Sequence, residues 1–369
     1  MFHNTYHGRR VLVTGDTGFK GSWLCYWLSR LGAEVHGLGL PPISTPNLFT
    51  VLRLMQQVRH STVDIRDAAT LTQHIKKISP EVVFHLAAQP LVRQSYLDPK
   101  TTFDTNIGGV VNLLEAVRAT PSVRACVVVT TDKCYENREW VWGYRETDAL
   151  GGHDPYSASK GAAELVAASY RRSFFQDSEV RLATARAGNV IGGGDWGADR
   201  IVTDFVTNIV SGHPLTLRYP NAVRPWQHVC EPLSGYLLLA TRLLQSDGAC
   251  FAEAWNYGPA ATSVTTVRSL ADMLVREWGH GTVVACDCEQ PHEAGLLQLD
   301  CSKANMQLNW RTVWDVAATV HHTVSWYKAF HDGSNMTTIT DQQLMQYQED
   351  AEGAGLPWAT YEAALSAVA

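Results

Sequence analysis

Apolar strands alternate with helical segments along the first 190 residues, and this alternation limits the possible folds more than any other feature. The runs that we predict as strands cover residues 11–13, 34–40, 62–63, 81–86, 125–129 and 180–185. Apolar residues recur at helical spacing over residues 19–31, 68–78, 99–119 and 154–174. Strands that are apolar throughout are buried on both faces, and a helix between two strands makes them run parallel. We therefore predict an α/β fold with a doubly wound parallel sheet.

Charge and composition exclude several classes of protein. The chain has 30 Lys and Arg against 36 Asp and Glu, a net charge of −6, without a basic block that would neutralise nucleic-acid phosphates. It has no apolar run of about 20 residues for a membrane span and no apolar leader after Met1. The eight cysteines include no Cys-x-x-Cys pair. We expect a cytoplasmic protein with free thiols that binds no metal, membrane or nucleic acid.

Three glycines form a loop between the first strand and the first helix. Gly15, Gly18 and Gly21 follow the pattern G-x-x-G-x-x-G. Small residues there let backbone N–H groups approach a pyrophosphate at the positive end of the helix, so we predict a Rossmann-like dinucleotide site. The second strand ends at Gly39 and Leu40 without the acid that usually binds the adenosine ribose, and without an arginine for a 2′-phosphate. The residues alone give a weak preference for NAD over NADP.

A tyrosine and a lysine four residues apart suggest acid–base chemistry. Tyr156 and Lys160 lie on one face of the predicted helix. A free tyrosine has a pKa of about 10, and a nearby cation would favour the phenolate that accepts a proton from a hydroxyl. Thr131 ends an apolar strand at the edge of the sheet where such folds bind ligands, and Asp132 and Lys133 follow it. These two charges are either part of the site or solvated charges on a surface loop.

These motifs lead to a family resemblance. Residues 9–330 resemble the extended short-chain dehydrogenase/reductase family and, more narrowly, the CDP-glucose 4,6-dehydratases. The resemblance rests on residues 14–24, 85–93, 131–135, 143–146, 154–157, 186–196 and 224–229. The glycine loop and Tyr-x-x-x-Lys are shared by the whole superfamily. The pair Asp132-Lys133 and the stretches 192–196 and 224–228 are more specific.

The resemblance implies a lyase that converts CDP-glucose to CDP-4-keto-6-deoxyglucose with tightly bound NAD. Tyr156, supported by Lys160 and Thr131, would remove the C4 hydroxyl proton while NAD takes the hydride. Asp132 would then protonate the leaving C6 hydroxyl, and Lys133 would act as the base at C5 or stabilise an enolate. The cofactor-binding residues that we predict are Gly15, Thr17, Gly18, Phe19, Lys20, Gly21, Asp64, Ile65, Leu86, Ala87, Ala88, Gln89, Tyr156 and Lys160.

Substrate binding is predicted for side chains suited to a nucleotide diphosphate and its sugar. Arginines make bidentate phosphate contacts, and aromatic rings offer flat surfaces to a base or ribose. The residues that we predict for the substrate are Arg93, Asn189, Arg200, Arg224, Trp226 and His228. The family pattern usually has histidine where this chain has Asp16. We expect that carboxylate to point to solvent or pair with Lys20, and to weaken NAD binding.

The length suggests more than one part. We predict an NAD-binding Rossmann-like domain over residues 1–190, which also carries part of the substrate site, and a smaller nucleotide-sugar lobe over residues 191–330. Residues 331–369 contain six acids and no Lys or Arg, and we expect an acidic appendage, either solvated or covering a subunit interface, with a helix around residues 340–350. The resemblance also implies a homodimer, or a higher homo-oligomer, formed through the long helices at 99–119 and 154–174.

Two other functions use part of the same motifs. A nucleotide-sugar 4-epimerase shares the glycine loop, Tyr156 and Lys160, but it does not need Asp132 and Lys133. A non-catalytic NAD-binding sensor needs only the glycine loop. The full set of acid, base and hydroxyl side chains favours the dehydratase over both.

Overall fold

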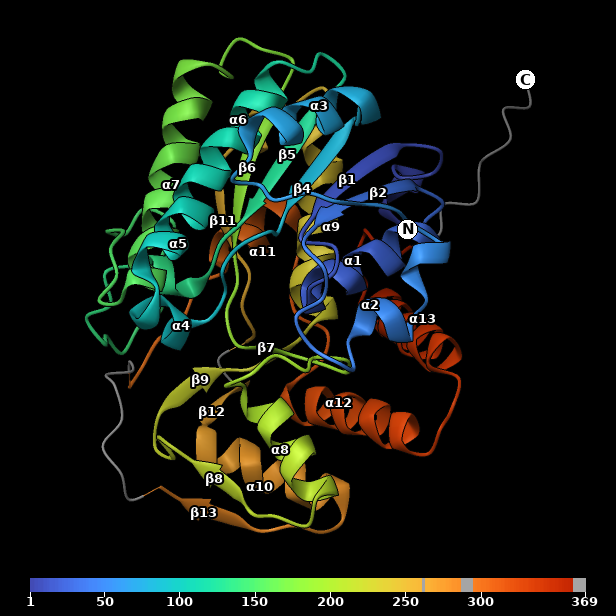
Figure 1. The fold of residues 1–369 in the computed structure, drawn as a ribbon, viewed down its shortest axis with the longest axis vertical. Coiled ribbons are helices and arrows are strands. Elements are labelled where there is room, and N and C mark those ends of the chain that lie inside the picture. Colours follow the sequence, from blue (N-terminus) through green and yellow to red (C-terminus); the bar gives the residue numbers. More distant parts are fainter. Residues whose placement is uncertain (261–262, 287–294, 361–369) are drawn as a thin grey trace.

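A seven-stranded parallel sheet forms the centre of the molecule (Figure 1). The computed structural model describes residues 1–260, 263–286 and 295–360. The strand order is β11-β6-β5-β4-β1-β2-β3, and every pair is parallel. The strands are β1 (Arg10–Thr14), β2 (Glu34–Gly39), β3 (Arg59–Thr62), β4 (Val82–His85), β5 (Ala125–Val129), β6 (Arg181–Arg186) and β11 (Ala254–Asn256). The predicted doubly wound α/β fold is confirmed.

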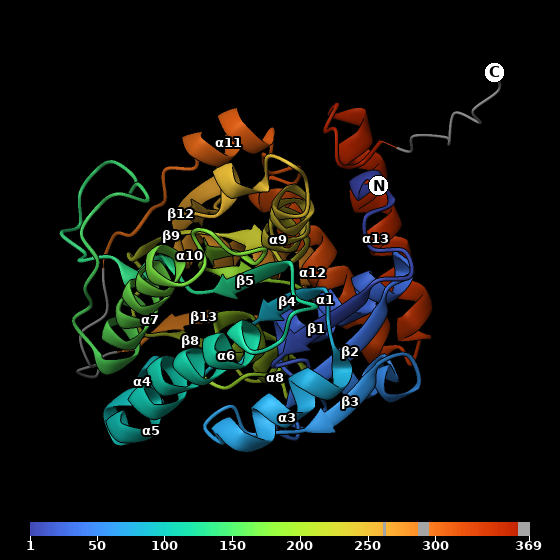
Figure 2. The ribbon, with the colours of Figure 1, turned by 90° about the horizontal axis from the view of Figure 1, so that it is seen from above.

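Alternate residues of the central strands point into two separate cores. In β1, Val11 and Val13 join one core, whereas Leu12 joins the other. Helices α1 (Phe19–Arg30) and α9 (Cys230–Leu243) cover the first face. Helices α3 (Ala68–Ile78), α6 (Gly109–Arg118) and α7 (Pro155–Ser173) cover the second (Figure 2). Burial on both faces explains why these strands are apolar at every position.

The predicted helix over residues 99–119 is interrupted in the structure. It consists of α5 (Pro99–Phe103), a π-helical turn (Asp104–Gly108) and α6. The turn directs Asn106 inward, where its side chain accepts a hydrogen bond from the Gln89 N–H (2.8 Å) and donates one to Ser159 Oγ (2.9 Å). A π turn of this kind is often found at functional sites, and here it ties the loop after β4 to α7.

A smaller lobe lies beyond the carboxyl ends of the strands (Figure 1). It contains helices α8 (Ile201–Val210) and α10 (Val267–Trp278). Its strands pair two by two: β7 (Val190–Ile191) with β10 (Gln227–His228), β9 (Val223–Pro225) with β12 (Val264–Thr266), and β8 (Leu215–Leu217) with β13 (Val283–Ala285). The chain also returns to the sheet between these pieces to form α9 and β11. The segment predicted for the lobe, residues 191–330, therefore contains elements of both the lobe and the sheet domain.

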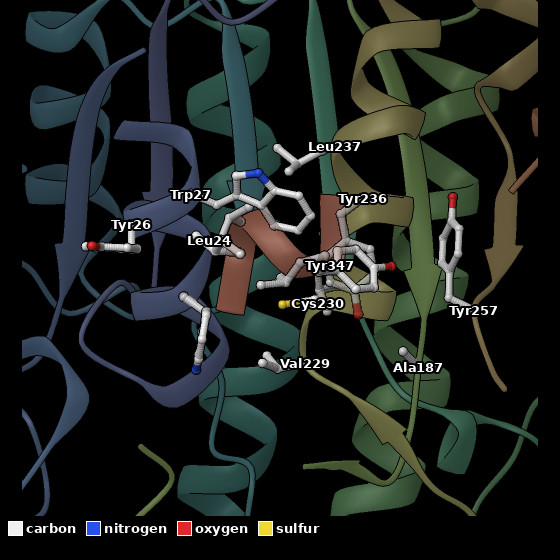
Figure 3. Close-up of a cluster of buried hydrophobic side chains, with 14 of the residues drawn as sticks. Leu24, Tyr26, Trp27, Ala187, Val229, Cys230, Tyr236, Leu237, Tyr257 and Tyr347 are labelled. Atoms are coloured by element: carbon white, nitrogen blue, oxygen red, sulfur yellow. The ribbon is translucent and has the colours of Figure 1, made fainter. Parts of the chain in front are cut away.

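The acidic C-terminal segment packs into the body of the protein as far as it is described. After α11 (Ser302–Leu308) and α12 (Val316–His331), helix α13 (Met336–Gly353) runs beside α12 and α1. Tyr347 of α13 is fully buried and meets Trp27 of α1 edge to face at 5.9 Å (Figure 3). Trp358 is also fully buried and stacks on Phe2 at 5.0 Å. The expected solvated appendage is wrong for residues 336–359, because one side of this segment is apolar and buried, and two of its acids bind the body: Asp341 pairs with Arg30 (2.7 Å), and Asp350 accepts a hydrogen bond from the Trp314 indole (2.7 Å).

Some properties can be stated for the described part of the chain alone. None of its helices is long and apolar enough to cross a membrane. It holds no group of three or more His, Cys, Asp or Glu side chains placed to bind a metal ion. Cys25, Cys126, Cys134 and Cys230 are buried free thiols. Cys286 is disulfide-bonded, which contradicts the expectation that all the cysteines are free.

Candidate active site

A cavity of about 380 Å³ opens at the carboxyl ends of the central strands, between the sheet and the smaller lobe. Parallel sheets of this type bind ligands at this edge, because the loops that follow neighbouring strands meet there. From the sheet domain the cavity is lined by Phe19, Lys20, Arg93, Thr131, Asp132, Lys133 and Tyr156. From the segment after β6 and the lobe it is lined by Asn189, Asp195, Asp199, Arg200, Arg218, Arg224 and Trp226.

Tyr156 reaches this cavity from the first turn of α7. The helix begins there because Asp154 caps it, accepting a hydrogen bond from the Ser157 N–H (2.9 Å), and because Pro155 occupies its first position. Burial raises the pKa of the Tyr156 phenol above its ordinary value, while a hydrogen bond with Thr131 opposes the rise. The Lys160 cation, which we expected to favour the phenolate, does not outweigh this burial.

Lys160 lies one turn further along α7 and is also buried. Burial lowers the pKa of its ammonium to about 8, and the nearby Glu164 carboxylate opposes that change. Glu164 is held by hydrogen bonds from Thr130, Thr184 (2.7 Å) and Arg186 (2.8 Å). The fixed Glu164 carboxylate thus helps to keep Lys160 charged.

Asp132 is a buried carboxylate at the end of β5, not a solvated loop charge. It is 1% exposed, and it accepts hydrogen bonds from Thr131 Oγ1 (2.8 Å) and Asn189 Nδ2 (3.0 Å). Gly188 makes room for it, since a Cβ atom there would overlap the carboxylate. Lys133 follows on the cavity wall and is half-buried. The structure therefore brings Thr131, Asp132 and Tyr156 together, with Asn189 as a fourth member.

The glycine loop is shaped by close backbone contacts. Gly15 has φ +75°, and a Cβ atom there would lie 2.7 Å from the Ala87 nitrogen. A Cβ atom on Gly21 would overlap the Gly15 carbonyl oxygen. Helix α1 begins at Phe19, and its N-cap residue Gly18 has no side chain, so the N–H groups of the first turn have no side-chain acceptor. A narrow, uncapped helix start fits the pyrophosphate of a dinucleotide.

Lys20 extends from the first turn of α1 to the cavity wall. Burial lowers the pKa of its ammonium to about 7, and the cations of Lys160 and Arg200 add to this effect. An anionic ligand placed among these three cations would favour the charged form of Lys20. The arrangement fits a phosphate group at this end of the cavity.

The other residues predicted to bind the cofactor lie in the glycine loop and in the segments that follow β3 and β4. Leu86, Ala87 and Ala88 follow β4, and Ala87 contacts Gly15. The Gln89 side chain is engaged in the fold, where it donates a hydrogen bond to Thr102 Oγ1 (2.9 Å). Thr17 Oγ1 donates to the Leu40 carbonyl (2.8 Å), which ties the loop to the end of β2. Ile65 is buried against Gly109.

The two acids near this end of the sheet each have a partner. Asp64 forms an ion pair with Arg66 (2.6 Å), and hydrogen bonds from Arg66 lower the pKa of its carboxyl. Asp16 is fully buried, and its Oδ2 lies 2.7 Å from Nδ1 of His60 on β3. Asp16 therefore does not point to solvent or pair with Lys20, as the sequence suggested, because Gly37 and Gly39 leave room for its side chain over β2.

The predicted substrate arginines line the cavity from both sides, Arg93 from α4 (Val92–Leu97) of the sheet domain and Arg200 and Arg224 from the lobe. Arg93 donates a hydrogen bond to Asp199 Oδ1 (3.0 Å), and Arg200 donates one to Asp195. Arg224 is buried and donates to the Val223 carbonyl (2.9 Å). Sequence reasoning missed Arg218, which also donates to Asp199 Oδ1 (3.0 Å). The spacing of apolar residues around Arg218 does not indicate a binding role. Its place in the cavity depends on how the lobe packs against the sheet domain.

Two predicted aromatic contacts have different outcomes. Trp226 lines the cavity, and its buried indole N–H has no hydrogen-bond partner in the structure. His228 is fully buried beside Trp314, 4.8 Å between ring centroids, and it does not line the cavity. The cavity therefore gives no support to the predicted substrate contact of His228, because β10 directs this side chain into the core.

The sheet, the glycine loop and the Tyr156–Lys160 helix define an extended short-chain dehydrogenase/reductase. Residues 12–323 match the family described as GDP-mannose 4,6 dehydratase, and the chain belongs to that family. The family resemblance seen in the sequence is thus confirmed.

Individual relatives share most of the chain. It is 48% identical over 350 residues to the CDP-glucose 4,6-dehydratase of Salmonella typhimurium, which covers 93% of this chain and 97% of that protein. A dTDP-glucose 4,6-dehydratase from Streptomyces venezuelae, solved with NAD and TYD bound, has a TM-score of 0.75 at 24% identity, over 88% of this chain and 98% of that one. The UDP-glucose 4-epimerase of Thermus thermophilus in complex with NAD has a TM-score of 0.74 at 26% identity, over 86% and 99%.

Proposed function

We propose that the chain is an NAD-dependent CDP-glucose 4,6-dehydratase, a hydro-lyase that forms CDP-4-keto-6-deoxyglucose. The observation that carries this proposal is the meeting of Thr131, Asp132 and Tyr156 in one cavity next to the glycine loop. An epimerase needs a base for one hydroxyl, whereas loss of water also needs an acid, and Asp132 is buried beside the tyrosine. The 48% identity to a CDP-glucose 4,6-dehydratase supports the same reaction.

The first step is removal of a proton from the C4 hydroxyl by the Tyr156 phenolate oxygen. Thr131 forms a hydrogen bond with the phenol, and we assign to the buried ammonium of Lys160, one turn along α7, the role of favouring the ionised form. The glycine loop and Lys20 would hold NAD, which would supply the acceptor for the C4 hydride and the donor of a hydride to C6, while C5 regains a proton from the base that removed it.

The second step is loss of water across C5 and C6. The ketone at C4 makes the C5 hydrogen acidic, and Lys133 on the cavity wall is the side chain that we assign as its base. Asp132 gives a proton to the C6 hydroxyl as it leaves as water. Hydrogen bonds from Thr131 and Asn189 fix the direction of the Asp132 carboxyl group. One proton leaves C5, one reaches the hydroxyl, and a double bond forms between C5 and C6.

The arginine cations of the cavity suit the diphosphate of the substrate. Arg93, Arg200, Arg218 and Arg224 all line the cavity, and Asp195 and Asp199 hold three of these guanidinium groups in position. Arginine groups that are already oriented lose little entropy when they bind phosphate oxygens. Trp226 offers its unpartnered indole N–H and ring face to the nucleoside.

The test is mass spectrometry of the products from CDP-, dTDP-, UDP- and GDP-glucose, each incubated with the purified protein and NAD. We expect CDP-glucose to give a product lighter by one water molecule, and the other three to react much more slowly. A product of unchanged mass and inverted C4 configuration would establish an epimerase. Binding of NAD with no change in any of the four sugars would establish a sensor, and either result would refute the proposal.

We also propose a cytoplasmic homodimer. Four large apolar side chains are exposed on α4 (Val92–Leu97), α5, α7 and the residue after α7: Leu97 (80%), Phe103 (38%), Leu165 (61%) and Phe174 (49%). Burial of this surface against a second copy would remove it from water. A sizing column with light scattering at micromolar concentration should give twice the monomer mass, and the monomer mass would contradict the proposal.

A further inference from the structure

The end of β2 lacks the acid that binds the adenosine ribose in most Rossmann folds, yet a carboxylate lies there. Gly37 and Gly39 are on the same face of β2, and a Cβ atom at either position would overlap or crowd the Asp16 side chain. At Gly39, the last residue of the strand, this Cβ atom would lie 2.7 Å from Asp16 Oδ1. The Asp16 carboxylate, which comes from the glycine loop, therefore occupies the space that a side chain at Gly37 or Gly39 of β2 would fill.

The two oxygens of this carboxylate have different surroundings. Oδ2 lies over Gly37 and is bonded to Nδ1 of His60 at 2.7 Å. Oδ1 lies toward Gly39 and the carboxyl end of β2, and it is buried without a hydrogen-bond partner. The Asp16 side chain is 0% exposed, and a buried carboxylate oxygen without a partner is costly. His60 thus fixes the group in one orientation, with its free oxygen toward the ribose end of the nucleotide site.

We propose that Asp16 is the residue that selects NAD over NADP in this chain. Its Oδ1 accepts a hydrogen bond from a ribose hydroxyl of the adenosine half, in place of the missing acid of β2. Its negative charge also repels the 2′-phosphate of NADP, for which the end of β2 offers no arginine. This proposal opposes the expectation that Asp16 weakens NAD binding, because the Asp16 carboxylate lies over β2 and pairs with His60 rather than with Lys20.

The test measures the affinity of NAD and NADP for the nucleotide-free protein by calorimetry, without any sugar nucleotide. We expect the wild-type protein to prefer NAD, and Asp16→Asn to reduce the NAD-to-NADP affinity ratio by about tenfold or more, as for a lost hydrogen bond to a charged group. Glu34→Gln removes a carboxylate at the opposite end of β2 and should leave the ratio unchanged. Because no turnover is measured, the result does not depend on the proposed reaction.

A double substitution separates ribose recognition from a purely structural role. The double variant Asp16→Gly/Gly39→Asp places the acid at the end of β2, in the space that the Asp16 side chain no longer fills. We expect this variant to prefer NAD, as the wild-type protein does. Gly39→Asp alone places two carboxylates in one space and should fold poorly. Equal weakening of both nucleotides by Asp16→Asn, or an unchanged ratio, would overturn the proposal, as would a double variant that binds NADP as well as NAD.

Discussion

Tyr156, the base that we propose, has surroundings that favour its neutral form. Burial raises the pKa of Tyr156, and a hydrogen bond with Thr131 only partly offsets the rise. Removal of the hydroxyl in Tyr156→Phe should lower turnover by about 10²–10⁴-fold, the usual contribution of a positioned base, while NAD affinity changes little. Steady-state rates with CDP-glucose and calorimetry with NAD check both parts. Tyr170→Phe on the same helix, outside the cavity, is the matched control, and equal rates for the two variants would remove Tyr156 from the mechanism.

Lys20 should make cofactor binding depend on pH. Its pKa is lowered to about 7 by burial and by the cations of Lys160 and Arg200. Only the protonated form attracts a pyrophosphate, so NAD affinity should fall as the pH rises through about 7 and level off once the lysine is neutral. Lys20→Met should weaken binding at about pH 6 and abolish this dependence, whereas Lys100→Met, an exposed lysine on α5, should not. A dependence that persists in Lys20→Met would contradict the assignment.

At this scale the sequence identified the residues of the sheet edge better than those of the lobe. Thr131, Asp132 and Tyr156 could be placed together because parallel strands end at one edge. Arg218 and the burial of His228 could not be foreseen, since they depend on how short lobe strands turn relative to the sheet. The contact between Asp16 and His60 could not be predicted either, because the two residues are distant in sequence and meet only when β2 and β3 pair.

Among the elements, α7 joins the site to the core through one buried ion pair. Glu164 and Arg186 are 2% and 3% exposed and lie 2.8 Å apart. Glu164→Gln leaves the Arg186 charge buried without its partner and should lower the free energy of unfolding by about 3 kcal/mol. Urea denaturation measures this change, with Glu115→Gln as control, because Glu115 pairs with Arg118 on the exposed side of α6 and should cost about 0.5 kcal/mol or less. A small effect of Glu164→Gln would show that the pair does not support α7.

The predicted bounds of helices and strands were accurate where the apolar residues follow a single helical or strand spacing. Helix α3 and strand β5 have the predicted bounds, and the other strands of the first 190 residues differ by a few residues at their ends. The π turn inside residues 99–119 was missed because side-chain bonds of Asn106 to Gln89 and Ser159, which are tertiary contacts, produce it. Apolar periodicity alone cannot distinguish such a turn from a continuous helix.

At the scale of the whole molecule, residues near the N-terminus and the last described residues pack into one core. Phe2, Trp27 of α1 and Trp358 meet in a single aromatic cluster, with centroid distances of 5.0 to 6.2 Å. Glu231 of α9 accepts hydrogen bonds from the Trp314 N–H (2.7 Å) and from the Tyr347 hydroxyl of α13 (2.8 Å). The acidic composition of residues 331–369 did not predict this packing. A count of charged residues gives no information about which apolar side chains of a segment are buried.

The C-terminal segment should therefore be required for stability rather than for catalysis. Trp358→Ala removes a fully buried indole and should lower the free energy of unfolding by about 3–5 kcal/mol, whereas Trp142→Ala, on a ring that is 61% exposed, should change it little. Truncation after Phe330 uncovers Trp27 and the α9 side of the core, and we expect aggregated protein on expression. Calorimetric unfolding of the two point variants and the soluble yield of the truncated chain measure these effects. A truncated protein that stays soluble and keeps its unfolding temperature would show that α13 packs on a core that is already complete without it.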